Sequence, residues 1–284
     1  YMRNEEDLPE DFIEIYIVDP AFHTVGFVPV SLVLRHPRSQ QISEIMREHE
    51  VVFTVTDEQD DVAYKFEQYH LGSAAVVDEN QRLVGSITID DIVDVIQEEA
   101  SEDMLRLGGV GDEEITDTIW STTQSRFGWL ALNLATAVLA SWVISLFDAS
   151  IEQMVALAIL MPIVASMGGN AGTQTMTVAV RAIAQRNLGP VNAVRVVVRE
   201  SAVGMLNGVA FALIIGLFAW WWFGSDQLGL VIGAAMIINM CAAALAGILI
   251  PLALDHFEID PAISSGVFVT TVTDVVGFFA FLGL

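Results

Sequence analysis

The stretch "MPIVASMGGNAGTQTMTVAVRAIA", residues 161–184, decides the fold class of this chain. It is apolar and long enough to cross a membrane as an α-helix, which takes about 20 residues for about 30 Å of hydrocarbon. It also holds a dense set of hydroxyl and amide side chains: Ser166, Asn170, Thr173, Gln174, Thr175 and Thr177. Because polar groups are costly against lipid, these should face water or another polar surface. The stretch therefore predicts a membrane helix with one face toward water or another polar surface.

Helical spacing separates two uses of the small and polar residues in this stretch. Gly168 and Gly172 form a GxxxG pair, which promotes close packing of helices in lipid. Packing explains the glycines well, but it explains the amides and hydroxyls poorly. Asn170, Thr173 and Thr177 recur at i, i+3 and i+7, which places them on one face of the helix. We expect this face to form a polar stripe along a pore.

The chain changes composition near residue 126. Residues 1–126 hold 28 Asp and Glu against 8 Lys and Arg, whereas residues 127–284 hold 8 against 4. The second part contains five apolar stretches that each reach the length of a membrane span. They cover residues 127–147, 153–184, 201–223, 228–254 and 262–284. The sequence thus predicts a soluble acidic part followed by an all-α membrane domain.

The net charge of −24 restricts the partners of the chain. It argues against nucleic acid, whose binding depends on neutralising phosphates, and against docking on anionic lipid headgroups. It favours cations, and the small divalent metals prefer oxygen ligands. The single cysteine, Cys241, lies inside an apolar span, which excludes an internal disulfide framework and a thiolate-rich metal site. The five histidines show no metal-ligand spacing.

Asp274 is an acidic residue in the middle of the last predicted span. It is the thirteenth residue of residues 262–284, which places it near the bilayer midplane. A carboxylate there costs roughly 2.5–3.5 kcal/mol on insertion scales. No Lys or Arg follows Arg199, so the last three spans offer no salt-bridge partner deep in the membrane. Protonation in a dry interface is one alternative, but we expect an ion site.

The basic residues of the membrane half predict its orientation. Its four arginines flank the connection between the second and third spans: Arg181, Arg186, Arg195 and Arg199. By the positive-inside rule this connection is cytoplasmic. Five spans then leave residues 1–126 in the cytoplasm and Leu284 outside. The chain begins with Tyr1 and no secretory signal opens it, so we expect the true N-terminus to be absent.

The soluble half contains an internal repeat. "VDPAFHTVG", residues 18–26, matches "VDENQRLVG", residues 77–85. In both copies the pattern predicts a strand, an Asp-rich turn and a second strand, and then a helix. The first copy is expected to have strands over 13–19 and 24–34 and a helix over 39–46, and the second to have strands over 73–78 and 83–89 and a helix over 90–97. Asp57 is expected to cap an amphipathic helix between the copies, which ends near Tyr69.

An acidic run joins the repeat to the membrane half. Its carboxylates recur every three or four residues, which stacks them on one side of a helix: Asp91, Asp94, Glu98, Glu99, Glu102 and Asp103. Like charges so placed destabilise the helix unless cations intervene. A solvated acidic surface is the simpler interpretation. We nevertheless expect these carboxylates to bind cations. The acidic run joins the soluble repeat, which has the look of a regulatory domain, to the membrane domain.

The repeat resembles a tandem pair of CBS domains, with the beginning of the first copy missing. In that family "GSITIDDI" is the nucleotide-contacting signature, which implies adenosine-nucleotide binding, for example ATP, at Thr88 and Asp91. The first copy has Pro29 and Leu32 at the matching positions, so at most one such site is complete. Thr88 and Asp91 would equally serve as caps of the helix that opens at Ile92.

The segments "PIVASMGGNAGTQT" and "TVTDVVGFF" resemble the transmembrane signatures of the MgtE family of magnesium channels. The order of a CBS pair, an acidic connecting helix and five spans also matches that family. The resemblance implies a homodimer in which the second and fifth spans of both subunits line one pore. It places Asp274 on the pore axis and implies that further residues line the pore: Gly169, Asn170, Gly172, Thr173 and Thr177. Some relatives have Asn at the position of Thr173.

The resemblance also divides the chain into parts. Residues 1–48 would be the end of the first CBS domain, 49–98 the second, 99–126 an acidic, plug-like connecting helix, and 127–284 the membrane domain. Asp260, in the turn before the last span, matches the cytoplasmic mouth. The cytoplasmic gating acids would be Asp57, Glu58, Asp60, Asp91, Asp94, Glu99, Glu102 and Asp103. Their repulsion would open the pore when Mg²⁺ is scarce, and bridging ions would close it.

Other function classes stay open at this point. A secondary transporter that couples Mg²⁺ to another ion would use the same Asp274. An intramembrane aspartyl protease needs two facing carboxylates, and only Asp274 lies deep in a predicted span. A nucleotide sensor with an anchoring membrane half would leave the polar second span unexplained. We therefore expect a Mg²⁺ channel of the plasma membrane that is not an enzyme, with Mn²⁺ or Co²⁺ as further candidate ions.

Overall fold

The computed structural model describes residues 12–111, 113, 116–186, 188 and 190–284. The chain divides into two compact units, Tyr1–Ser101 and Glu102–Leu284. The first eleven residues of the predicted first CBS domain lie outside the described residues.

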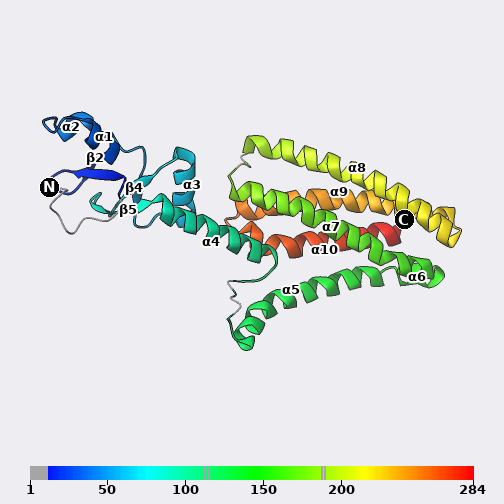
Figure 1. The fold of residues 1–284 in the computed structure, drawn as a ribbon. Helices are drawn as coiled ribbons and strands as arrows, with labels where there is room; N and C mark the ends of the chain where they lie inside the picture. Colours follow the sequence, from blue (N-terminus) through cyan, green and yellow to red (C-terminus); the bar gives the residue numbers. More distant parts are fainter. Residues whose placement is uncertain (1–11, 112, 114–115, 187, 189) are drawn as a thin grey trace. The chain divides into compact units, whose positions relative to one another are not determined.

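The first unit is built on two small sheets (Figure 1). One sheet pairs β1 (Glu14–Val18) and β2 (Thr24–Pro29) antiparallel. The other has the order β3–β4–β5, with β3 (Val52–Thr54) parallel to β4 (Ser73–Val77) and β4 antiparallel to β5 (Leu83–Thr88). The hydroxyl of Tyr16 donates to Ser73 Oγ at 2.8 Å and so joins the two sheets.

The two copies of the repeat form the same turn. Asp19 Oδ1 accepts from the backbone N–H groups two and four residues later, at 2.8 and 2.9 Å, and Asp78 Oδ1 does the same at 2.8 and 2.9 Å. Both turns contain a residue with positive φ, Phe22 at 67° and Gln81 at 62°. Each strand pair also shifts register just before the turn. The repeat predicted from the sequence is therefore a repeated local structure.

The helices of the first unit differ from the prediction. The strand predicted over 24–34 ends at Pro29, and α1 (Val30–Arg35) follows, because an extended Pro29 serves as the helix N-cap and lacks an N–H for a ladder. The helix predicted over 39–46 is only α2 (Ile42–Ile45).

Asp57 was predicted to cap the next helix, and this is wrong. Glu58 is the N-cap residue of α3 (Gln59–Tyr69), without a side-chain cap bond. Asp57 instead accepts from Thr54 N–H at 3.1 Å and from Thr54 Oγ1 at 2.7 Å. It therefore closes the turn between β3 and α3.

The small core of this unit lies between its three-stranded sheet and two helices. Phe53 of β3 and Phe66 of α3 are buried and stack with ring centroids 5.7 Å apart. Ile92, near the start of α4 (Ile89–Leu107), is buried against the same cluster. The amphipathic spacing predicted for these helices is thus used for packing.

The acidic connecting helix has different limits from those predicted. α4 runs without a break from Ile89 to Leu107, so it begins inside the predicted CBS domain. It does not continue to residue 126. Among the described residues after Leu107, the next helix, α5, begins at Ile119.

The second unit holds five helices that are long and apolar enough to cross a membrane. These are α5 (Ile119–Ser145), α7 (Val155–Ala184), α8 (Pro190–Phe223), α9 (Asp226–His256) and α10 (Pro261–Gly283). A short helix, α6 (Asp148–Gln153), precedes α7. The five predicted spans are therefore present, with α5 starting eight residues and α8 eleven residues earlier than expected.

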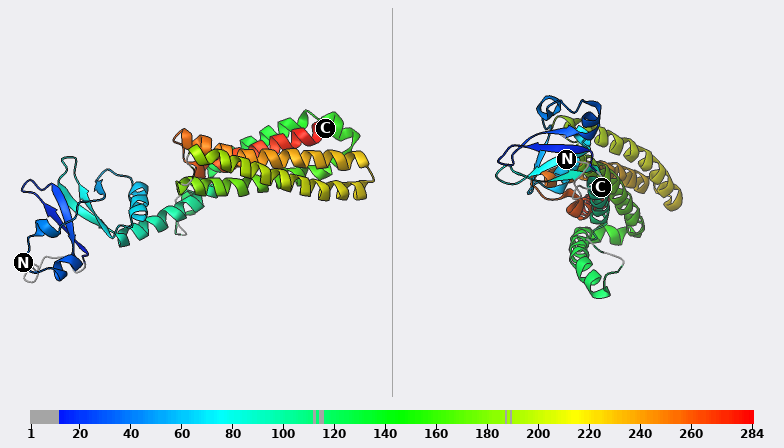
Figure 2. Two further views of the ribbon diagram at one scale, coloured as in Figure 1. Left: turned by 90° about the horizontal axis from the view of Figure 1, so that it is seen from above. Right: turned by 60° about the vertical axis from the view of Figure 1, so that its left-hand side comes forward.

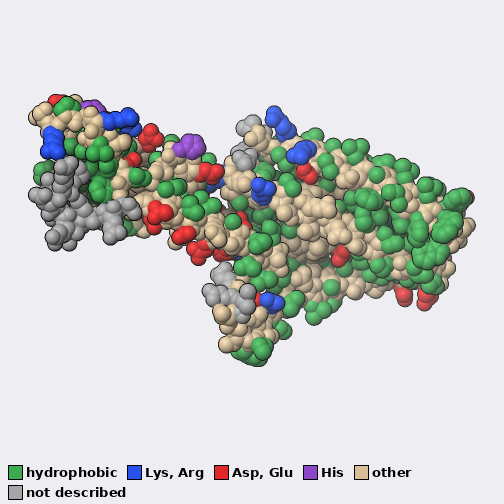
Figure 3. Space-filling model, viewed as in Figure 1, with side chains coloured by type: hydrophobic (Ala, Val, Ile, Leu, Met, Phe, Trp, Pro, Cys, Tyr) green, Lys and Arg blue, Asp and Glu red, His purple; other side chains and the backbone are tan. Residues whose placement is uncertain are grey.

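Helix α9 is the centre of the membrane bundle. α7, α8 and α10 all pack along it, and α10 also packs on α7 (Figure 2). α7 and α8 barely touch each other. A close approach between α8 and α9 depends on Gly204, because a Cβ there would lie 2.6 Å from Ala244 Cβ. Apolar side chains cover much of the visible face of the bundle, and basic side chains gather near the beginning of α8 (Figure 3).

Candidate functional site

Asp274 lies on α10 as a half-buried residue. Within the part of the chain that the structure describes, its carboxylate has neither a hydrogen bond nor an ion pair. The threonines before it donate to carbonyl oxygens of their own helix: Thr270 to Gly266, Thr271 to Val267 and Thr273 to Thr270. Their hydroxyl donors are therefore used, and none of the described residues is left to pair with the Asp274 carboxylate.

The two sequence signatures meet where α7 packs on α10. A Cβ on Gly172 of α7 would lie 2.5 Å from Val269 Cγ1 and 3.5 Å from Thr273 Cγ2 of α10. Thr273 directly precedes Asp274. The glycine-rich segment of the second span thus lies at the level of the acidic residue of the last span, about 100 residues later in the sequence.

The predicted polar stripe lies on an open side of α7. Asn170, Thr173 and Thr177 are exposed, and a Cβ on Gly169 would meet nothing within 4 Å. The hydroxyls of Thr173 and Thr177 donate to carbonyls of their own helix at 2.9 Å, while their oxygens keep lone pairs that can accept from water. The face predicted from helical spacing is thus available for water or for another subunit.

Asn239 is a residue of this region that sequence reasoning missed. It is fully buried in α9, where Nδ2 donates to the carbonyl of Val164 in α7 at 2.8 Å, and Oδ1 has no hydrogen-bond partner among the described residues. A Cβ on Gly168 would lie 2.2 Å from Nδ2, and a Cβ on Gly277 would lie 2.7 Å from it. The side-chain amide of Asn239 thus contacts both α7 and α10. Its contact on α10, Gly277, lies one turn from Asp274. The sequence did contain a signal for this residue, because a single Asn inside an otherwise apolar span indicates a polar contact within the bundle.

Asp260 caps the last helix and also holds α4. Its Oδ1 accepts from Ala262 N–H at 2.7 Å, and its Oδ2 accepts from Arg106 Nη1 at 2.7 Å. Arg106 also donates to Glu102 one turn earlier in α4. The next residue, Leu107, packs against a buried cluster from α7 and α10 (Met176, Val180, Ala262 and Val269). The end of α4 is therefore docked on the two helices that carry the signatures.

The predicted gating acids are not gathered in one place. Among the described residues, no group of three or more His, Cys, Asp or Glu side chains is arranged to hold a metal ion. Glu58 and Asp60 are exposed at the start of α3, and Asp94 and Glu98 are exposed on α4. The hydrogen bonds from Thr54 lower the pKa of Asp57, so this carboxylate stays ionised at neutral pH.

Thr88 and Asp91 contact each other at the start of α4. The backbone N–H and the hydroxyl of Thr88 donate to Asp91 Oδ2 at 3.1 and 2.8 Å. The helix begins at Ile89 and not at Ile92 as expected, and this contact lies at its start. Both residues lie near the surface of the unit.

Comparison with known proteins matches two family models to parts of the chain. The family model described as MgtE, divalent cation transporter, matches residues 161–284, and the CBS domain model matches residues 42–98. Residues 161–284 therefore match the MgtE family. Both signatures that meet between α7 and α10 lie within the MgtE match.

Curated relatives named "Magnesium transporter MgtE" match along most of this chain. The protein of Enterococcus faecalis is 32% identical over 274 residues, covering 96% of this chain and 60% of its own length. The protein of Thermus thermophilus is 32% identical over 293 residues, covering 100% of this chain and 64% of its own length. The chain therefore spans about three-fifths of the length of the curated relatives it matches.

Two solved structures match about a third of this chain. The soluble part of a magnesium transporter is 32% identical, covers 35% of this chain and 39% of that one, and gives a TM-score of 0.33. The cytosolic domain of the Mg²⁺ channel MgtE in complex with ATP is 31% identical, covers 30% and 35%, and gives a TM-score of 0.29.

Proposed function

We propose that this protein is a Mg²⁺ channel that imports magnesium across the plasma membrane as a homodimer. One observation carries the proposal: among the described residues Asp274 is an unpaired carboxylate at mid-span, and the residue before it, Thr273, lies close to Gly172 of α7. In its ionised form such a group is costly in a membrane unless water or a cation lies beside it. In a symmetric dimer, two copies of Asp274 supply two negative charges that balance one divalent ion.

The chemistry of Mg²⁺ supports a pore of this kind. Mg²⁺ gives up its waters reluctantly, so proteins often hold it through one or two carboxylates and several retained waters. A wide site with two copies of Asp274 meets this need. Gly169, Asn170, Gly172, Thr173 and Thr177 line the path in this proposal, and their carbonyl, amide and hydroxyl groups bond to the ion's waters. Mn²⁺ and Co²⁺, with similar coordination, are the next candidates.

The proposed orientation places the soluble unit in the cytoplasm and Leu284 outside. The clustering of arginines around the connection between α7 and α8 supports it. With this orientation, the Arg106–Asp260 contact lies at the cytoplasmic mouth of the pore. Docking of α4 on α7 and α10 there supports a gate that α4 controls.

In the proposed gating, cytoplasmic Mg²⁺ closes the pore by bridging acids that otherwise repel. Two unit charges 4 Å apart interact by about 4 kcal/mol at an effective dielectric of 20. A few bridged pairs among the eight predicted gating acids are therefore enough to shift a two-state gate. Two chains of this composition bring such acids together across a dimer interface. ATP at Thr88 and Asp91 is a further proposed ligand of the soluble unit.

The decisive measurement is Mg²⁺ flux into liposomes that contain the purified chain or its Asp274→Ala variant. We expect flux to fall to the background of empty liposomes, with the dimer intact in gel filtration. Asp226→Asn, an exposed carboxylate at the start of α9, is the matched control and should keep its flux. Unchanged flux in Asp274→Ala would refute the proposal, and a reversal potential that depends on a second ion would favour coupled transport instead.

A further inference from the structure

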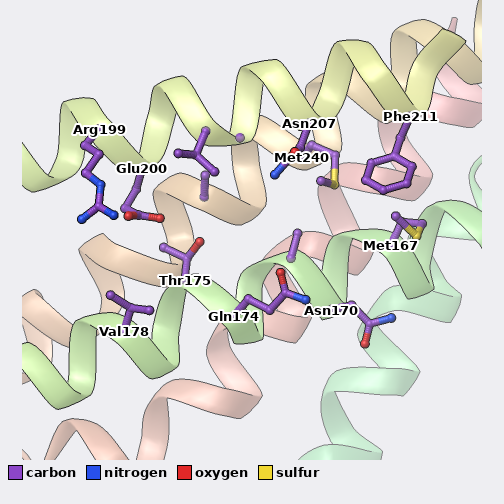
Figure 4. Close-up of a pocket in the computed structure, with 14 residues that line it drawn as sticks. Met167, Asn170, Gln174, Thr175, Val178, Arg199, Glu200, Asn207, Phe211 and Met240 are labelled. Atoms are coloured by element: carbon purple, nitrogen blue, oxygen red, sulfur yellow. The ribbon is translucent and has the colours of Figure 1, made fainter.

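The cleft between α7 and α8 contains a cavity of about 370 Å³. α7 and α8 form its walls, and α9 contributes Met240 and Ala244 to its floor (Figure 4). Asp274 is not among the residues that line it. At about 30 Å³ per water, the cavity has room for roughly a dozen water molecules. It is therefore large enough for a hydrated ion.

Glu200 is the unusual residue of this cavity. Only 9% of it is exposed, although it lies eleven residues into α8 and carries an ionisable group. Its side chain points from α8 into the space between α8 and α7 (Figure 4). Within the described parts of the chain, nothing forms a hydrogen bond or an ion pair with it. A buried carboxylate without a partner is costly, so it indicates a ligand.

The surrounding side chains offer neutral oxygen atoms. Asn207 lies two turns from Glu200 on the same face of α8, and Asn170, Gln174 and Thr175 of α7 also line the cavity. Carboxylate, amide and hydroxyl oxygens are the donor set of hard cations. Arg199 also lines the cavity beside Glu200 (Figure 4), but it is exposed and, among the described residues, forms no ion pair with Glu200. An anion would face the Glu200 carboxylate and is disfavoured.

We propose that this cavity is a second divalent-cation site, separate from Asp274. The Glu200 carboxylate holds the ion, and the amides of Gln174 and Asn207 bond to it or to its retained waters. A single carboxylate with several waters is a coordination that Mg²⁺ accepts. The identity of the ion as Mg²⁺ rests on the proposed function, whereas the existence of the cation site rests on the cavity and on Glu200.

The site is tested by direct binding of Mn²⁺, followed by electron paramagnetic resonance of the free ion. The purified full chain in detergent carries Asp274→Asn in every sample, which removes the pore carboxylate. We expect Glu200→Gln to remove one bound Mn²⁺ per chain, while Asp226→Asn removes none. Equal numbers of bound Mn²⁺ and equal affinities with and without Glu200→Gln would overturn the proposal.

Two further variants keep the test valid if Glu200→Gln fails to fold. Gln174→Leu and Asn207→Leu change exposed side chains of the cavity and should weaken the same Mn²⁺ site at least tenfold. Unchanged affinity in both overturns the proposal in that case. The result is independent of the pore: unchanged binding in Glu200→Gln together with lost flux in Asp274→Ala would remove the second site and leave the proposed channel standing.

Discussion

At the scale of single residues, the glycines of α7 have different roles that their sequence does not distinguish. Gly168 touches the buried amide of Asn239, whereas Gly169 faces open space. Overpacking a tight core contact typically costs 1–3 kcal/mol. We therefore expect Gly168→Ala to lower the thermal unfolding temperature in detergent by several degrees, and Gly169→Ala to leave it unchanged. Equal effects of the two substitutions would contradict the packing role of Gly168.

His49 predicts how the soluble unit responds to pH. Its ring stacks between Tyr16 and Phe27, with centroids 5.8 and 5.5 Å away, and burial lowers its pKa. A lowered pKa means that the folded state favours the neutral ring. The resulting stability is complete above the ordinary value near pH 6.5 and is lost as the pH falls through the folded-state pKa.

We expect this loss to appear as a lower unfolding temperature between pH 7 and pH 5. His49→Gln should reduce the slope of stability against pH in this window, because it removes the titrating ring. His70→Asn changes an exposed histidine with positive φ, which Asn tolerates, and should keep the native slope. The same slope in the native chain and in His49→Gln would rule out this role. Thermal unfolding followed by circular dichroism provides the measurement.

At the scale of elements, α4 is the helix whose two ends belong to different parts of the chain. Its end is held by Arg106, which donates to Asp260, and by Leu107, which packs on α7 and α10. Asp260 has two roles, since its other oxygen caps α10. Asp260→Asn keeps a good N-cap residue and removes the ion-pair charge. The two roles can therefore be separated.

We expect Arg106→Gln to weaken closure, so that a higher internal Mg²⁺ concentration is needed to inhibit the current. Asp260→Asn should act in the same direction. The two substitutions together should add little to either alone, because each removes the same ion pair. Patch recordings at graded Mg²⁺ concentrations measure the midpoint of inhibition. Fully additive shifts of the inhibition midpoint would show that Arg106 and Asp260 do not act through a shared ion pair.

At the scale of the whole molecule, the net charge of −24 is concentrated in the part of the chain before the spans. In the described residues of one chain these acids form no metal cluster. In the proposed gating, their effect comes from repulsion that bound ions relieve. This makes the gate sensitive to the sum of several acids rather than to one site.

The combined variant Asp94→Asn, Glu99→Gln, Glu102→Gln tests this collective role. We expect its currents to resist internal Mg²⁺ that closes the native channel, because fewer charges remain for ions to bridge. Asp148→Asn, Glu152→Gln, both in α6, removes charges from the other end of the bundle and should leave inhibition unchanged. Inhibition at the native Mg²⁺ concentration in the combined variant would refute the gating proposal.

The sequence by itself determined the features that depend on local chemistry. Crossing hydrocarbon requires about 20 apolar residues in a row, so the five spans could be predicted from composition alone. The repeated turns follow from Asp19 and Asp78, whose bonds reach only four residues ahead. The stripe of Asn170, Thr173 and Thr177 follows from helical spacing. Errors occurred where local signals compete, as at Pro29, which ends a strand and begins a helix.

Only the tertiary structure decided which distant residues meet. Arg106 and Asp260 are 154 positions apart, and Asn239 reaches Val164 across 75 positions. Glu200 resembles an ordinary acid near a span end until the packing of α7 and α8 on α9 encloses it. Such contacts depend on how whole helices pack against one another, and this packing cannot be predicted from a local pattern of residue types.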